Sequence, residues 1–548
     1  MFRRSKPAQL DVWFFGGTSA QFRDVPRNIE RIKHLSLLNI EGDIFSACTR
    51  LTVPAPNLQS LAIQLLDFDC STSDLGSALP LPDGLLGGDA PQLNRLRLDG
   101  ATLAWNARIL RRMPNLTHLR LGLPTIDDYD FGDIARDSGE FSDTEEEEGE
   151  DEDEAAIAHT TSENPAEAYV PGGQAPPSSV PLLQSLVTSA LLDDDMDVEA
   201  IVAAADLQHA GDSDSDFDGS NTSSEFEDEE MDILDPRPPA EWTDIFGMLK
   251  SMPKLQELDL AYALPHPDFS SGALPPAEQF TLSGLKSLHL EDRAESIKLI
   301  IQHLHLPNLQ HLVLKTVEQH GSVEDSASLY EILNAHCEKS KANGNAVHTL
   351  NISISAKWTL TIKGLRALWS KDEREQVIFK LKIQQSSPHD RGTADVLLPL
   401  LDGLQIPSLR RVVVHGFGQT IQGWDWVTAF HHLSNIEEVS VGAAAPHFVQ
   451  ALGSALSALP PDMPPPAEGE WEIFLPSLKI LELRKGAQLS RKIYGQPIRG
   501  WEQLAGVLEV RGAALELEKL DIRQSKLRPA SRTDIERWGI AKTVLFPS

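Results

Sequence analysis

The side chains best suited to chemistry in this sequence are three cysteines and a pair of adjacent histidines. Cys48, Cys70 and Cys337 are scattered, with no Cys-x-x-Cys pair and no histidine at zinc-ligand spacing. His431 and His432 stand at the end of a predicted helix, and no carboxylate or cysteine is arranged near them in the sequence. We therefore expect neither a disulfide framework nor a metal site, and we interpret the histidine pair as partly exposed surface.

Motifs for nucleophilic, phosphate-binding or metal-assisted catalysis are also missing. The sequence has no Gly-x-Ser-x-Gly, no His-Glu-x-x-His and no Walker A loop. The glycines of GFGQTIQG at 416–423 lack the Walker lysine and predict a turn after a strand. We predict that the chain is not an enzyme and uses no cofactor, which leaves binding as its class of function.

One leucine pattern recurs through most of the chain: a turn, often Pro-x-Leu, followed by Leu-x-x-Leu-x-Leu. About thirteen units are found, some with Ile or Val in place of Leu. Ten units are clear and three are weaker. The clear units contain Leu58, Leu93, Leu116, Leu255, Leu285, Leu309, Leu409, Ile436, Leu478 and Leu517, and the weaker ones centre on Leu35, Leu350 and Leu381.

The pattern predicts short parallel strands. The last two leucines of a unit alternate at period two, so both face one side of a strand while the residue between them faces the other. A single strand cannot bury that apolar side alone, whereas stacked units form a continuous leucine column. We predict an α/β leucine-rich-repeat solenoid, or horseshoe, with a parallel sheet on its concave face and helices on its convex face. The alternative is an ordinary α/β sheet with leucine-rich strands.

Segments between the predicted strands have apolar residues at three- and four-residue spacing, which predicts helices. The predicted helices are 328–338, 362–369, 425–433, 446–459 and 501–510.

Irregular repeats opened by Pro-x-Leu, with tryptophan-rich helices between them, resemble the repeat region of fungal (basidiomycete-type) F-box/leucine-rich-repeat proteins. The opening RSKPAQLDVWFF is similar to the segment that follows the F-box in that family and starts the first strand. The resemblance covers the chain except an acidic insert. It implies substrate recognition for a ubiquitin ligase, but no F-box precedes Arg4, so an adaptor partner is expected only if an F-box lies upstream.

The acidic insert accounts for the whole negative net charge of the chain, which is −33. Between Asp127 and Asp235 there are 35 acidic residues against one basic residue, Arg136, while the other 46 acidic and 47 basic residues nearly cancel. Such a segment repels itself and has little to bury, so we predict that it is disordered. The predicted domains are therefore 1–126 and 240–548, both made of repeats, and the insert at 127–239.

Two features of the insert could be used by partners. Residues 180–207 are apolar at helical spacing, which predicts either a helix that docks or one that forms only transiently. Several hydroxyl residues have an acidic residue three positions on, a pattern that acidophilic kinases accept and that acidic runs also produce by chance. We predict phosphorylation among Ser142, Thr144, Ser213, Ser215 and Ser224.

The predicted concave face collects the residues that alternate with the strand leucines, and many are cationic. This face is either a solvated surface with incidental cations or a patch for an acidic partner, for which the insert would compete. The candidate binding residues are Arg95, Arg97, His118, Arg120, His289, His311, Lys315, Lys380, Lys382 and Arg411.

Two functions follow from these features. The first is a scaffold that recognises a protein substrate through its concave face, as in F-box/leucine-rich-repeat proteins. The alternative is an acidic nuclear scaffold or histone-chaperone-like protein whose insert binds basic partners. Direct nucleic-acid binding is disfavoured because phosphates would repel the insert.

The scattered cysteines fit a reducing compartment. Asp11 interrupts the first apolar stretch before a signal-peptide core develops, and no apolar run reaches the roughly 18–20 residues that span a bilayer. We therefore expect a cytoplasmic or nuclear protein with no membrane partner.

Overall fold

A computed structural model describes most of residues 8–122 and 241–546. The longer stretches outside the described residues are 1–7, 16–21, 41–47, 66–78, 123–240, 266–278, 367–375, 386–392, 455–473, 485–491, 498–503, 509–516 and 525–532. The chain divides into two units, one made of Met1–Pro124 with Leu234–Ser548 and the other of Thr125–Ile233. All of the described residues belong to the first unit.

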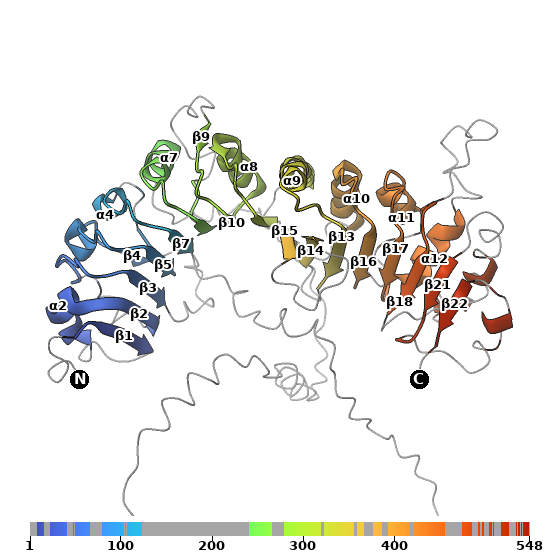
Figure 1. Cartoon of the computed structure of the whole chain (residues 1–548), viewed down its shortest axis with the longest axis horizontal. Helices are drawn as coiled ribbons and strands as arrows, with labels where there is room; N and C mark the ends of the chain where they lie inside the picture. Colours follow the sequence, from blue (N-terminus) through green and yellow to red (C-terminus); the bar gives the residue numbers. More distant parts are fainter. Residues whose placement is uncertain are drawn as a thin grey trace, which may run out of the picture. The chain divides into compact units, whose positions relative to one another are not determined.

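The first unit is built on a mostly parallel 16-stranded sheet (Figure 1). A strand lies at each of the thirteen places where the leucine pattern occurs, and β1, β14 and β22 complete the sheet. In spatial order the strands are β1 (Leu10–Phe15), β2 (Ile32–Ile40), β3 (Ser60–Leu65), β5 (Arg95–Asp99), β7 (His118–Gly122), β8 (Glu257–Ala261), β10 (Ser287–Glu291), β12 (His311–Glu318), β15 (Val377–Gln385), β14 (Thr359–Leu365), β13 (Thr349–Ile354), β16 (Arg411–His415), β17 (Glu438–Val441), β18 (Ile480–Leu483), β21 (Leu517–Asp521) and β22 (Ala541–Leu545).

Helices follow many of the strands, and those from α4 to α11 lie along one side of the sheet (Figure 1). The described helices are α2 (Asp24–Asn28), α4 (Arg108–Arg111), α7 (Trp242–Lys250), α8 (Ala294–His303), α9 (Val323–Ala342), α10 (Thr393–Gly403), α11 (Gly423–Phe430) and α12 (Ala445–Ser454). Helices α9, α11 and α12 lie where the sequence predicted helices. The predicted helix at 501–510 is described only in part, with helical residues at 504–506 and 508.

The core lies between the sheet and the helices. Equivalent leucines stand opposite one another on neighbouring strands, as Leu96, Leu119 and Leu258 do on β5, β7 and β8. Each of these three side chains is 1% exposed. A parallel sheet is stable only when this apolar side is covered, and here the helices cover it. The other side of the sheet, which we call the polar face, carries the side chains that alternate with the leucines.

The turns before the strands are also joined to one another. The backbone N–H of Asn94 donates to the carbonyl of Gln59 at 2.9 Å, and that of Thr117 donates to Asn94 at 2.8 Å. Asparagines in the turns add side-chain bonds, since Asn115 Nδ2 donates to the carbonyl of Pro91 at 2.8 Å. Asn57 and Asn308 bond to preceding turns in the same way. These bonds explain why Pro-Asn-Leu recurs at the start of the units.

The sheet continues across the acidic insert. Strands β7 and β8 are direct neighbours in unbroken register, although residues 123–256 separate them in the sequence. Side chains support this junction from both sides: Lys254 Nζ donates to Asn115 Oδ1 at 2.7 Å, and Trp105 Nε1 donates to the carbonyl of Ala263 at 3.0 Å. The parts of the chain on either side of the insert therefore contribute to one continuous sheet.

One part of the sheet departs from the parallel pattern. Strands β13, β14 and β15 form an antiparallel meander whose order in space is the reverse of its order in the sequence, so β15 pairs with β12 and β13 pairs with β16. The predicted helix at 362–369 is wrong, because β14 occupies Thr359–Leu365. The alternation in TLTIKGL buries Leu360 and Ile362, and this period of two prevails over the helical spacing of Ile362 and Leu365.

A glycine permits this meander to pack. Gly364 on β14 lies opposite Phe379 on β15, and the Phe379 ring occupies the space that a Cβ at position 364 would need. Phe379 is fully buried, so it has no room to move away.

Candidate functional site

The candidate binding residues lie on the polar face in three rows that run across the strands. The first row contains Arg95, His118 and His311, and on the far side of the meander Arg411 takes an equivalent position. The middle row contains Arg97, Arg120, His289 and Lys380. The third row contains Lys315 and Lys382. The sequence did not reveal that carboxylates share these rows with the cations.

In the N-terminal part of the face, Asp99 and Asp259 hold most of the cations. Arg120 Nε donates to Asp99 Oδ1 at 2.8 Å, and its NH1 lies 3.4 Å from Asp259 Oδ2. Arg97 also pairs with Asp99. His289 Nδ1 lies 3.0 Å from Asp259 Oδ1 on the other side, so Asp259 bridges Arg120 and His289.

These neighbours change the acidity of Asp259. Burial alone would raise its pKa, but the hydrogen bond from His289 and the charges of His289, Arg120 and Arg97 outweigh burial and lower the pKa below its usual range. The carboxylate is therefore held in its charged form. His118 and Glu257 form a more exposed pair beside it, with His118 Nε2 3.2 Å from Glu257 Oε1.

Lysines gather in the middle of the face, where β12, β14 and β15 meet. Lys315 is buried and pairs with the buried Glu291, Nζ to Oε1 2.7 Å. Lys380 stands opposite Lys363 of β14, and Lys382 stands opposite Lys315. We call Lys363, Lys380 and Lys382, which are all partly exposed, the lysine cluster. Lys363 was missed in the sequence because its segment was expected to be a helix.

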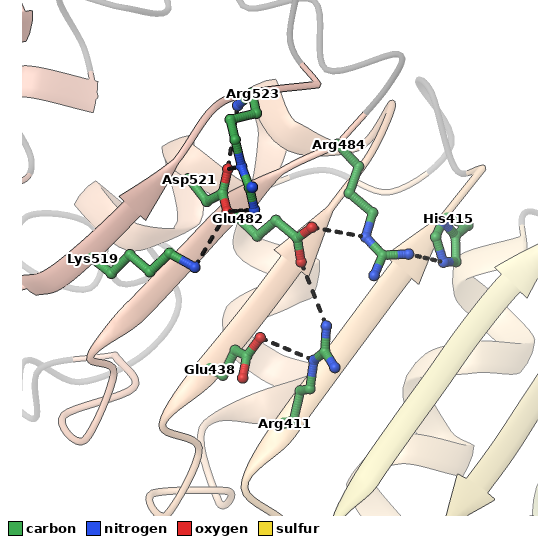
Figure 2. A network of polar contacts seen from close by, with 8 residues as sticks. All are labelled: Arg411, His415, Glu438, Glu482, Arg484, Lys519, Asp521 and Arg523. Carbon is green, nitrogen blue, oxygen red and sulfur yellow. Dashed lines mark hydrogen bonds and ion pairs between the residues drawn. The ribbon is translucent and has the colours of Figure 1, made fainter. Parts of the chain in front are cut away.

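In the C-terminal part, a polar network covers β16 to β21 (Figure 2). Arg411 is buried, with its Nε 3.1 Å from Glu438 Oε1 and its NH2 3.5 Å from Glu482 Oε2. Glu482 also forms an ion pair with Arg484, whose Nε lies 3.5 Å from Glu482 Oε1. NH1 of Arg484 lies 3.2 Å from Nε2 of His415. Arg411 thus holds two neighbouring strands together through their carboxylates.

The two ends of this network differ electrostatically. Burial raises the pKa of Glu438 above its usual range, and the nearby Glu482 adds to this rise, although Arg411 opposes it. At Asp521, burial would raise the pKa, but hydrogen bonds from Arg523 and Lys519 lower it below its usual range. Arg523 NH2 lies 2.7 Å from Asp521 Oδ2, and Lys519 Nζ lies 3.3 Å from the same oxygen.

The polar face therefore presents paired charges in both its outer parts and a concentration of lysines in its middle. Lys315 and Arg411 are buried and hold carboxylates of the chain itself. Arg95 is exposed at the start of β5. The sequence identified the cations, but their pairing depends on which residues face each other across strands, and only the register shows that.

Two exposed aromatic side chains lie at the β1 end of this face. Trp13 is 71% exposed and Phe15 is 69% exposed, and both alternate with the partly buried Val12 and Phe14 that pack on the core. Trp13 stands opposite Ser36 of β2, in the middle row. Large exposed aromatic residues on a face of this kind are frequent energetic centres of protein interfaces.

A shallow pocket of about 590 Å³ opens at the edge where the strands begin. Its lining is polar and includes Thr117, Gln256, Lys286 and Asn308. Asn308 already donates to the carbonyl of Ser283, and Thr117 to that of Asn94, so these groups serve to join neighbouring turns.

The predictions for the acidic insert lie outside the described residues. They include the phosphorylation candidates Ser142, Thr144, Ser213, Ser215 and Ser224 and the apolar stretch at 180–207.

In the part of the chain that the structure describes, every helix is too short or too polar to cross a membrane. Comparison with known proteins gives no assignment, since no protein-family model, no curated protein and no solved structure matches the chain.

Proposed function

We propose that this chain is a leucine-rich-repeat solenoid that binds a protein partner through its polar face. The observation that carries the proposal is the arrangement of charged and aromatic side chains in rows on the side of the sheet opposite the helices. Solenoid proteins use such extended faces for binding, because each stacked unit adds side chains to one surface. No catalytic step is part of this proposal.

The repeat interpretation is supported by the coincidence of strands with the leucine pattern. Each of the thirteen units places a strand in the same sheet, and the equivalent leucines are buried in register. The hydrogen bonds between successive turns have the same form at several units. An ordinary α/β sheet would not require these turns to repeat.

Substrate recognition for a ubiquitin ligase is the pathway that we propose for this binding. Its support is the resemblance of the repeats to F-box/leucine-rich-repeat proteins, in which the repeats select the substrate. Binding to a ligase adaptor would require an F-box. For these residues we therefore propose the recognition of the substrate.

The partner that suits this face has an acidic surface and, well separated from it, an apolar patch, because seven strands lie between β1 and β15. The lysine cluster would receive carboxylates, while Trp13 and Phe15 would bury their exposed rings. Burial of aromatic rings supplies much of the affinity in protein interfaces, and complementary charge directs the approach of the partner.

Cross-linking tests which face the partner covers. The full chain is used as bait in lysate, treated with an amine-reactive cross-linker, and the cross-linked lysines are identified by mass spectrometry. We expect links from Lys363, Lys380 and Lys382 to one set of proteins, and few links from Lys254 and Lys286 at the edge where the strands begin.

Charge-reversal variants provide the matched control. Lys363→Glu with Lys380→Glu should reduce capture of that set at least tenfold, whereas Lys286→Glu with Lys341→Glu, two exposed lysines away from the polar face, should leave it unchanged. Equal loss in both double variants, or links confined to the edge lysines, would contradict binding through the polar face.

A second function is favoured by the concentration of 35 acidic residues between Asp127 and Asp235. In this case the insert binds basic proteins such as histones, and the sheet serves as a support. Deleting 127–239 should then abolish capture, and capture should weaken steeply as salt increases. If the polar face is the binding surface, capture should survive both treatments.

A further inference from the structure

One group of ionisable side chains lies away from the polar face, where α10 and α11 end. Asp402 is the second-last residue of α10, and His431 and His432 directly follow α11. Each side chain can offer one ligand atom, and the three ligand atoms lie within 4.8 Å of one another. The histidine pair stands out in the sequence but its carboxylate does not, because Asp402 lies 29 residues before His431.

The hydrogen bonds of the two imidazoles decide which nitrogens are available. His431 Nδ1 lies 2.7 Å from the carbonyl of Thr428, and His432 Nε2 lies 3.3 Å from the carbonyl of Leu404. A carbonyl only accepts hydrogen bonds, so both of these nitrogens carry the proton. The lone pairs are therefore on Nε2 of His431 and Nδ1 of His432.

This arrangement is the one that metal-binding histidines have. A ligating imidazole generally donates its other N–H to a carbonyl or carboxylate, which fixes the ring and its tautomer. Here both rings are fixed in this way, and their planes are 78° apart with centroids at 5.4 Å.

Nδ1 of His432 supplies a second, independent observation. It is a buried atom, and it has no hydrogen-bond partner among the described residues. A buried nitrogen lone pair without a partner is unfavourable, and a metal ion would satisfy it.

We propose that Asp402, His431 and His432 bind a divalent transition-metal ion of the zinc type. Two imidazoles and a carboxylate suit such an ion better than they suit calcium or magnesium, which prefer oxygen ligands. Zinc holds its ligands at about 2.0–2.2 Å, which places them roughly 3.4 Å from one another, so the exposed Asp402 and His431 side chains would have to turn inward by up to about 1.4 Å. The remaining coordination positions are open to water or to a donor from a partner.

The ion would join two successive helices of the outer layer. Asp402 belongs to α10 and the histidines to the end of α11, and these two helices pack against each other. Binding would therefore stabilise this contact, in addition to any role of the polar face. The acidic insert holds many carboxylates and two histidines, His159 and His209, and can also attract cations, so the test depends on variants of the three proposed ligands.

Metal titration of the full chain tests the proposal. Protein stripped with a chelator is titrated with Zn²⁺ in competition with a chromophoric chelator, and thermal unfolding is followed with and without Zn²⁺. We expect one tight equivalent of Zn²⁺ and a higher Tm with the ion. His431→Gln with His432→Gln should remove the tight equivalent and the rise in Tm, and Asp402→Asn should weaken the affinity at least tenfold.

The control is His305→Gln, which changes an exposed histidine outside the group and should leave both measurements unchanged. Circular dichroism verifies that each variant is folded. The proposal is overturned if the unaltered chain has no tight equivalent, or if the double histidine variant keeps it. It is also overturned if Asp402→Asn binds as tightly as the unaltered chain, since the site would then lack its carboxylate.

Discussion

At the scale of the residue, Asp259 is the acidic centre of the N-terminal charge network, and its effect on stability should depend on pH. Its pKa is lowered in the folded chain, so the stability it contributes is present above the unfolded pKa of about 3.9 and is lost as pH falls through the folded value. We expect Asp259→Asn to lower the free energy of unfolding by about 1–3 kcal/mol at pH 7.

Urea unfolding between pH 3 and pH 7 measures this effect. The difference between Asp259→Asn and the unaltered chain should shrink as pH falls below 4. Glu257→Gln is the matched control, because the Glu257 side chain is 59% exposed although it pairs with His118. This variant should lower the free energy of unfolding by at most about 1 kcal/mol. A difference at Asp259 that stays constant with pH would contradict the role assigned to its charge.

Lys315 and Glu291 form a buried ion pair. Removing one of the two charges should lower the free energy of unfolding more than removing both. Lys315→Met leaves the carboxylate of Glu291 buried without its main counter-charge, which should cost about 3–5 kcal/mol. Lys315→Met combined with Glu291→Leu replaces two charges by apolar groups and should recover most of that loss. Chemical denaturation of the two single variants and the double variant measures the coupling, and additive losses would contradict it.

At the scale of the element, the antiparallel meander depends on the missing side chain of Gly364. Gly364→Ala forces a methyl group against the buried Phe379 ring and should lower the free energy of unfolding by about 1–3 kcal/mol. Gly247 in α7 is the matched control, because nothing lies within 4 Å of a Cβ added there. Gly247→Ala should raise stability by up to about 1 kcal/mol, as expected for an exposed helical glycine. Thermal unfolding distinguishes the two, and equal effects would contradict the close packing at Gly364.

The elements also show which structural features can be predicted from the sequence. Strands such as β5 and β8 were predictable because two buried leucines at period two fix their direction and their buried side. Strand β14 was not, because the spacing of Ile362 and Leu365 also fits a helix, and pairing with β13 and β15 decides in favour of the alternating pattern. Strand β22 lacks the leucine pattern and is defined by pairing with β21.

The candidate site was predictable to a similar extent. Arg120 and His289 could be assigned to one surface from their positions beside the leucines. Asp259 stands between Leu258 and Leu260 and could be assigned to the same surface, but its role as the common partner of both depends on the pairing of β8 with β7 and β10. Asp402 and His432 illustrate the same limit, since their proximity arises from the packing of α10 on α11.

At the scale of the whole molecule, the sheet should not need the acidic insert. Strands β7 and β8 pair directly, and the Lys254–Asn115 and Trp105–Ala263 hydrogen bonds support the junction. Deleting 127–239 should therefore leave the helix and strand signal in far-ultraviolet circular dichroism, compared per molecule, nearly unchanged. The Tm should also stay nearly unchanged, since loop-closure entropy depends weakly on length. A fall in Tm of more than about 5 °C, well over 1 kcal/mol for a chain of this size, would show that the insert supports the fold.

The reversed order of β13, β14 and β15 has a mechanical consequence. If the chain were pulled from its two ends, strands from β22 back to β16 could be peeled away singly, because each is then the last in the sheet. The next strand in the chain is β15, which lies between β12 and β14 and is still held on both sides. Force would have to shear it out or detach the three strands together, so the extension trace should contain one larger step among smaller ones. The meander would therefore divide the strand-by-strand unfolding of the sheet under force into two stages.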